Sequence, residues 1–211
     1  MMLTKNIRSS ILLLTLTIVM VISFFLYWRD ASYYVIGDLS ELSEIRRKYL
    51  GWIIAHFGFA AFTLFLGPIQ FMPWVRKKYI SFHRWAGKVY IIGSIISALT
   101  VFVLLATTYT LPGAIPSLGL LAAIWLYVTI VAYLAIRKKR VKVHQEFMLR
   151  SYICGLAFVF IRILPVIHDY TGLFEFIEDD TMRRTVYEWI CWVYPLMFIE
   201  FWLVWRKQVK A

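Results

Sequence analysis

Four histidines are the side chains of this 211-residue chain best suited to bind a metal or a haem. They are His56, His83, His144 and His168. Imidazole nitrogens from two helices can ligate haem iron from opposite faces, and single histidines bind zinc or copper. An imidazole also serves as a packing hydrogen-bond partner, so a structural role for each histidine stays open.

His83 and His144 form the pair that best fits a haem b. Each stands just before an apolar stretch, which places the two imidazoles at matching depth. Arg84 and Arg150 lie beside them, and guanidinium groups pair with carboxylates such as the haem propionates. His56 is the remaining candidate ligand for such a cofactor. A haem in this place would exchange electrons with a lipid-soluble partner, for which a quinone is the natural choice.

A metal ion is the alternative occupant of the same pair. Met148 follows His144 by one helical turn and would lie on the same helix face. A site made of His83, His144 and Met148 would suit copper(I) through the thioether, or zinc through the imidazoles.

Arg162 is the least expected residue of the chain, because it lies inside the apolar stretch FVFIRILP. An unpaired charge at such a depth costs at least about 2.5–3.5 kcal/mol. Glu188 and Glu200 lie in a later apolar stretch and are the carboxylates considered for pairing, with Glu188 the closer match in depth. Together with His168 they predict an intramembrane polar network, which either fixes helix register or serves a proton or substrate pathway.

The elements that must position these residues are membrane helices. The chain is 61% hydrophobic and 18% aromatic, with a mean hydropathy of +0.71. Soluble domains are usually about 45–50% apolar. Apolar runs of about 20 residues predict an all-α, polytopic bundle of six transmembrane helices forming a single domain over residues 1–211. The predicted spans are about 9–28, 50–72, 89–108, 118–136, 151–169 and 185–205.

The distribution of charge predicts the orientation of the bundle. The side holding both termini carries 16 lysines and arginines against one acidic residue, Glu146. The positive-inside rule therefore places the N- and C-termini in the cytoplasm of a multi-pass protein of the plasma membrane. Because the basic residues stand in short clusters between apolar runs, we read the net charge of +11 as topology and not as nucleic-acid binding. These clusters are also candidate contacts for anionic lipid head groups.

The segments HFGFAAFTLFLGPIQF, HRWAGKVY and HQEFMLRSY, with Arg162 downstream, resemble a bacterial family of predicted membrane proteins known as domain of unknown function 2306. The resemblance covers about residues 50 to 165. It implies a helical membrane bundle whose polar signature includes His56, His83, His144 and Arg162. It implies no particular activity.

Two functions from different classes follow from these residues. One is a haem- or metal-binding membrane redox protein, similar to b-type cytochromes, that uses the cytoplasmic-side histidine pair. The other is a non-catalytic protein of membrane transport, assembly or interaction, in which the histidines and Arg162 form a structural network. An enzyme acting on lipid is a third class, and the sequence leaves open whether the protein is an enzyme.

Overall fold

The computed structural model describes residues 2–37, 42–108 and 111–209, and the part described is all-α, as predicted. The long helices are α1 (Met2–Val35), α3 (Leu50–Phe71), α5 (Ile80–Thr107), α6 (Ile115–Arg137), α7 (Val141–Gly155), α8 (Ala157–Thr171) and α9 (Asp180–Gln208). Between them lie the short helices α2 (Glu44–Lys48) and α4 (Pro73–Lys78) and the 3-10 turn η2 (Pro112–Ala114).

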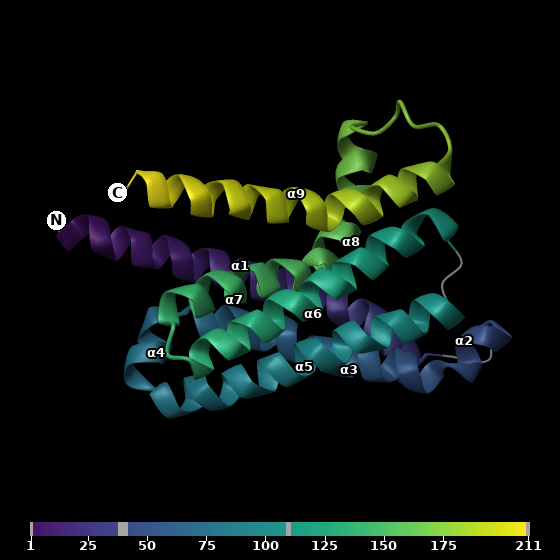
Figure 1. Ribbon diagram of the computed structural model, residues 1–211. Coiled ribbons are helices and arrows are strands. Elements are labelled where there is room, and N and C mark those ends of the chain that lie inside the picture. The colour runs from purple at the N-terminus through teal and green to yellow at the C-terminus, as the bar shows by residue number, and fades with distance from the viewer. Residues whose placement is uncertain (1, 38–41, 109–110, 210–211) are drawn as a thin grey trace.

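The long helices lie side by side in one bundle (Figure 1). Helix α5 packs between α3 and α6, α7 folds back along α6, and α9 lies against α7 and α8. The start of α1 and the end of α9 lie at the same end of the bundle as α4 and the α6–α7 connection (Figure 1). We call this end the basic end, because it holds Arg76, Lys77, Lys78 and residues 137–140.

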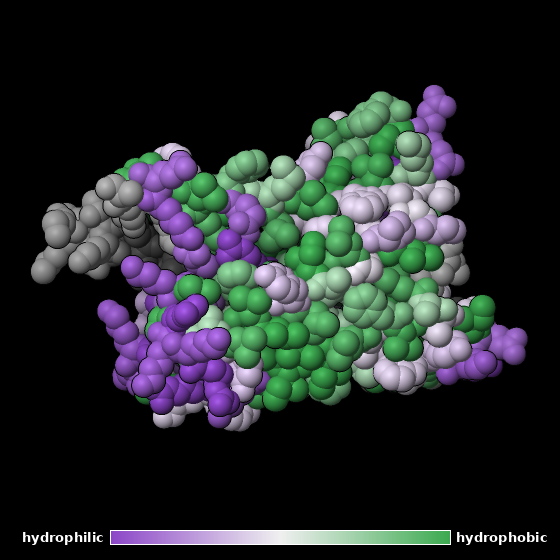
Figure 2. All heavy atoms as spheres, viewed as in Figure 1, coloured by the Kyte–Doolittle hydropathy of each residue, from purple (hydrophilic) through white to green (hydrophobic). Residues whose placement is uncertain are grey.

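On the face shown in Figure 2, the middle of the bundle is apolar and the basic end is hydrophilic, and further hydrophilic residues lie at the corners of the opposite end. Large apolar side chains point outward from several helices, among them Ile92 on α5, Tyr127 on α6 and Phe198 on α9. Soluble proteins rarely expose contiguous apolar surface of this extent. This apolar surface around the middle of the bundle therefore faces the hydrocarbon core of a bilayer.

Four segments are long and apolar enough to cross a membrane: Leu13–Tyr34, Leu50–Phe71, Ile80–Thr107 and Pro112–Arg137. A fifth crossing results if α7 and α8, which are bent by 47° relative to each other, count as one broken span. Helix α9 is not among them, since its glutamates and polar aromatic residues lower its mean hydropathy. The structure thus supports four or five of the six predicted spans.

Several helices also extend beyond the predicted spans. Helix α1 continues past residue 28 to Val35, and α5 begins at Ile80 and not near 89. The predicted span 151–169 is divided between α7 and α8, and the predicted basic loop 137–150 is largely the first part of α7. Apolar runs mark where lipid is, whereas a helix satisfies its own backbone hydrogen bonds and can continue into the polar interface.

Small and hydroxylated residues pack the middle of the bundle. A Cβ on Gly93 would lie 2.9 Å from the carbonyl oxygen of Phe59, so only glycine permits this approach of α5 to α3. The hydroxyl of Ser151 on α7 bonds to Thr129 on α6 at 2.7 Å and to Tyr90 on α5 at 3.1 Å. These bonds connect three helices and fix where α7 lies, which in turn positions His144.

Candidate functional site

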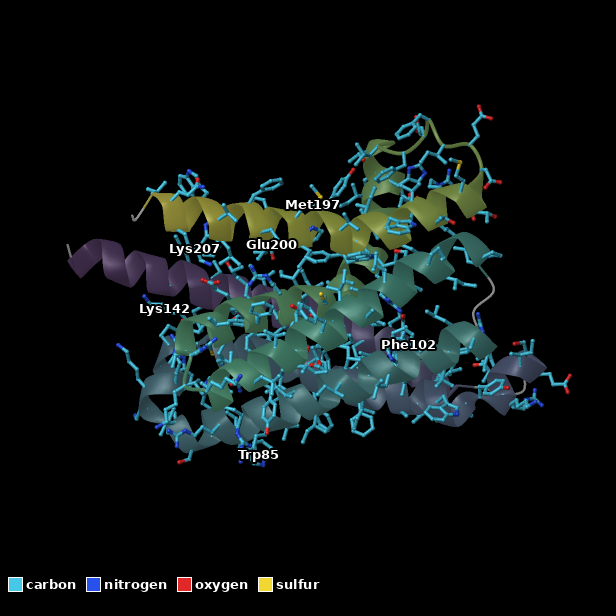
Figure 3. All side chains as sticks on the ribbon, viewed as in Figure 1. Trp85, Phe102, Lys142, Met197, Glu200 and Lys207 are labelled. Atoms are coloured by element: carbon cyan, nitrogen blue, oxygen red, sulfur yellow. The ribbon has the colours of Figure 1, made fainter. Side chains whose placement is uncertain are left out.

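A cleft of about 1300 Å³ lies at the basic end, and we call it the basic pocket. Its walls come from the end of α3, from α4, from the start of α5, from the α6–α7 turn region and from the C-terminal half of α9. Figure 3 shows Lys142 on α7 and Lys207 on α9 at this end of the bundle. The cationic side chains that line the pocket are Arg76, Arg84, Lys88, Arg137, Lys139, Lys142 and Lys207.

The structure brings His83 and His144 into the basic pocket from two different helices, α5 and α7. Nδ1 of His144 donates a hydrogen bond to the carbonyl oxygen of Ala132 on α6, at 2.9 Å. This bond fixes the ring and leaves Nε2 as the nitrogen available to a ligand. Nδ1 of His83 is buried and makes no hydrogen bond within the described chain.

Apolar side chains complete the pocket. Phe71, Ile91, Met148 and Leu203 line it, and Met148 is buried. Across the described ranges, no group of three or more histidine, cysteine, aspartate or glutamate side chains is arranged to hold a metal ion.

Arg150 takes a different partner from the one expected for it. Its Nη2 donates to Oε2 of Glu200 at 2.8 Å and its Nε to Oε1, so the pair is bidentate and connects α7 to α9. A second ion pair joins the same helices nearby, between Nζ of Lys207 and Oε2 of Glu146 at 2.9 Å. Arg84, by contrast, lines the basic pocket and remains a candidate to hold an anion there.

His56 faces a separate site farther along the bundle. It lines a cavity of about 280 Å³, which we call the inner cavity, together with Arg162, Glu188, Cys154 and Cys191. The cavity lies at the break between α7 and α8, against α3, α5, α6 and α9. The structure thus places His56 and Arg162 together and apart from the His83–His144 pair.

Arg162 forms an ion pair with Asp30, a carboxylate that was not considered from the sequence. Its Nε donates to Oδ2 of Asp30 at 2.5 Å, its Nη1 donates to the carbonyl oxygen of Phe158 at 3.0 Å, and its guanidinium lies 3.7 Å from the centre of the Phe158 ring. Glu188 lines the same cavity as Arg162, whereas Glu200 pairs with Arg150. The pair thereby fastens α8 to α1.

His168 lies apart from both sites. Its ring packs near Phe174 and Tyr187 toward the end of α8, and its Nδ1 is buried without a hydrogen-bond partner among the residues described. The predicted network is therefore distributed over separate places. Arg162 and Glu188 share the inner cavity, and neither Glu200 nor His168 lines it.

Comparison with known proteins identifies a family. A family model described as "Predicted membrane protein (DUF2306)" matches residues 53–203, which is most of the chain. The chain belongs to this family. No curated protein and no solved structure gives a significant match. The family assignment confirms the resemblance seen in the sequence and agrees with the apolar helices of the structure.

The DUF2306 match includes all four residues of the sequence signature but begins after α1. Asp30, which neutralises Arg162, therefore lies outside the matched region. Sequence reasoning missed Asp30 because the apolar run ends at Trp28 and the next residues were assigned to a loop. Gln70 belongs to the GPIQF part of the family resemblance, but no role was assigned to it from the sequence. Its Nε2 is buried without a partner in the described structure, and it lines the basic pocket. An acidic residue two positions after the end of the apolar run was the available signal for Asp30.

Proposed function

We propose that this DUF2306 protein binds a haem b in the basic pocket, where His83 and His144 would hold the iron and the haem would supply one-electron transfer. The proposal rests on one observation: two imidazoles from different helices line one pocket that combines apolar walls with many guanidinium and ammonium groups. A porphyrin needs apolar walls for its ring, axial ligands for its iron and cations for its propionates. The pocket volume of about 1300 Å³ exceeds the usual range of about 300–1,000 Å³ for small-molecule sites, which suits a large cofactor.

The hydrogen bond of His144 supports this assignment. Metal-ligating histidines usually donate their second ring nitrogen to a carbonyl oxygen or a carboxylate, which orients the ring. His144 makes this bond to Ala132, and the backbone of α6 therefore sets the direction of its Nε2. Haem bound there would supply one-electron chemistry, while the chain would hold the iron and set its surroundings.

Cationic side chains of the pocket are available to bind the propionates, which are the acidic groups of a haem. Arg84 and Arg76 are the arginines of the pocket nearest in sequence to His83, and either guanidinium can hold a propionate in a bidentate manner. Arg150, which we expected in this role, is already engaged by Glu200. The role therefore passes to Arg84, Arg76 and the neighbouring lysines.

The membrane arrangement that we propose has six crossings, with the bent pair α7–α8 as the fifth and α9 as the sixth. Both termini and the basic pocket then face the cytoplasm of a bacterial cell. The concentration of lysine and arginine at the basic end supports this orientation. Electrons would pass between the haem and a quinone dissolved in the bilayer.

A second candidate function is non-catalytic. Lys88, Lys139 and Lys142 make the pocket attractive to the head group of an anionic lipid, and Trp202 and Leu203 offer apolar surface to an acyl chain. In that case the protein serves transport, assembly or interaction in the membrane, and the histidines act as hydrogen-bonding groups.

The absorbance spectrum of the detergent-purified protein, expressed with ample haem, tests the first function. We expect stoichiometric Soret and alpha bands on reduction with dithionite, lost in His83→Ala and in His144→Ala. His168→Ala is the matched control, because this histidine lies outside both sites, and its spectrum should equal that of the wild type. A spectrum without haem bands in the folded wild-type protein rules the haem function out.

Elemental analysis of the same samples tests the metal alternative. Stoichiometric copper or zinc that is lost in His83→Ala and reduced in Met148→Leu would assign the site to a metal ion. Neither haem nor metal, combined with co-purified anionic lipid that is lost in Lys142→Gln, would favour the second function.

A further inference from the structure

The inner cavity has the properties of a binding site that the haem proposal does not use. It lies among buried side chains, and rings of Tyr27, Phe57, Trp125 and Phe158 form part of its wall. Ligand sites in proteins are mostly apolar and aromatic, with a few polar groups that orient the ligand. At about 280 Å³ the cavity holds a single substituted ring and excludes a drug-sized molecule or a porphyrin.

The hydrogen bonds of His56 define the chemistry that this cavity offers. Nδ1 of His56 lies 3.2 Å from the carbonyl oxygen of Ser97 and 3.1 Å from Oγ1 of Thr100. A carbonyl oxygen only accepts, and the hydroxyl of Thr100 already donates its proton to that same carbonyl, at 2.7 Å. A proton on Nδ1 satisfies both of these contacts. The hydroxyl of Ser97 also lies 3.2 Å from Nδ1 and then serves as a further acceptor.

The second nitrogen of the ring follows from this assignment. In a neutral imidazole with its proton on Nδ1, Nε2 carries a lone pair and accepts a hydrogen bond. Because Nδ1 faces α5, Nε2 is the nitrogen left to a ligand. A ligand that satisfies it must donate an O–H or N–H group.

The charges around the cavity and its location restrict the class of ligand further. The guanidinium of Arg162 forms an ion pair with the carboxylate of Asp30, and Glu188 lines the same cavity, so the cavity presents no uncompensated arginine to an anion. The cavity lies within the apolar part of the bundle, and its ligands arrive most easily from the bilayer. These conditions favour a neutral, lipid-soluble molecule.

We infer that the inner cavity binds a neutral single-ring quinol or phenol, whose hydroxyl group donates a hydrogen bond to Nε2 of His56 and whose ring packs against Trp125. This inference does not depend on the haem proposal, since it concerns a different cavity and is measured by binding alone. If both hold, the protein has one site for a quinol and another for a haem.

Isothermal titration of the full-length protein in nanodiscs tests the inference, under anaerobic conditions. The probe is 2,3-dimethoxy-5-methyl-1,4-hydroquinone, and its 1,4-dimethyl ether is the matched ligand, which keeps the ring and lacks both O–H groups. We expect one hydroquinone bound per protein. The loss of one well-placed hydrogen bond should weaken binding of the ether by about tenfold.

Two protein variants complete the test. His56→Leu should weaken hydroquinone binding by about tenfold, whereas His168→Leu should leave it unchanged. Ala60→Phe, which fills the cavity and keeps the hydrogen bonds of His56, should abolish binding of both compounds. Thermal unfolding of each variant shows whether it is folded. Equal affinity for the hydroquinone and its ether, or unchanged binding in Ala60→Phe, overturns the inference, and neither result affects the haem spectrum.

Discussion

Arg162 and Asp30 show how a single charge is accommodated inside this bundle. Both side chains are mostly buried, with 23% and 19% of their surface exposed, so each depends on the other for solvation. Replacing Asp30 by Asn should destabilise the protein by about 2–3 kcal/mol, because it leaves a buried guanidinium without its counterion. Thermal or denaturant unfolding in detergent measures this loss.

The double variant Asp30→Asn with Arg162→Gln provides the control for this prediction. Removing both charges together should recover much of the stability, since no buried charge is left unpaired. Arg29, which also contacts Asp30, is 62% exposed and remains solvated without it. If the two single changes are neutral, or if their effects simply add, the pair does not stabilise the fold.

Ser151 is the second residue with a measurable structural role. Its hydroxyl is fully buried and bonds to the hydroxyls of Tyr90 and Thr129. Ser151→Ala should cost about 1–3 kcal/mol, because two buried hydroxyls then lose a partner. Unfolding in detergent checks the value, with the exposed Ser81→Ala as control. A Ser151→Ala protein as stable as this control would contradict the prediction.

The candidate residues were predictable from the sequence by type more than by partner. Histidines and an arginine in apolar surroundings are visible in any reading, and the structure does bring His83 and His144 to one pocket. The interaction partners of these residues were harder to predict. Asp30 lies 132 residues from Arg162 in the sequence, and only the packing of α1 against α8 joins them.

At the scale of elements, α9 is the helix whose position depends most on polar contacts. Arg150–Glu200 and Lys207–Glu146 both hold its C-terminal half to α7. Because Glu200 and Lys207 are substantially exposed, each pair contributes little to global stability. Glu200→Gln should instead increase hydrogen exchange in the last turns of α9, with little change in the unfolding midpoint.

A charge swap tests whether this effect is electrostatic. Arg150→Glu combined with Glu200→Arg should restore slow exchange in α9, whereas Arg150→Glu alone should accelerate it. Exchange in α3 serves as the internal reference. Equal exchange in all variants would mean that apolar packing alone holds the helix.

The regions of the central helices were easier to predict than the helix ends. Apolar runs indicated the regions of α3, α5 and α6 well, since those runs are long and free of charge. The bend between α7 and α8 was not visible, because its segment contains no proline or charge at the break and reads as a continuous apolar run. The extension of α1 to Val35 was missed because the helix continues for seven residues after the apolar run ends at Trp28.

At the scale of the whole molecule, the two ends of the bundle differ in charge. The basic end should face the cytoplasm, with both termini on that side. A fluorescent protein fused after residue 211 should fluoresce, and a single cysteine placed at Glu175 should react with an impermeant maleimide added to intact cells. A non-fluorescent fusion or labelling only after cell lysis would reverse the orientation.

The inner cavity also provides the native protein with its own chemical reporters. Cys154 and Cys191 are the two cysteines of the chain, both thiols are free and buried, and both line this cavity. Covalent labelling by a small uncharged alkylating reagent therefore measures how often the cavity admits a molecule, without any engineered cysteine. The alkylation rate, followed by mass spectrometry of the intact chain, then reports how often the bundle opens at the α7–α8 bend.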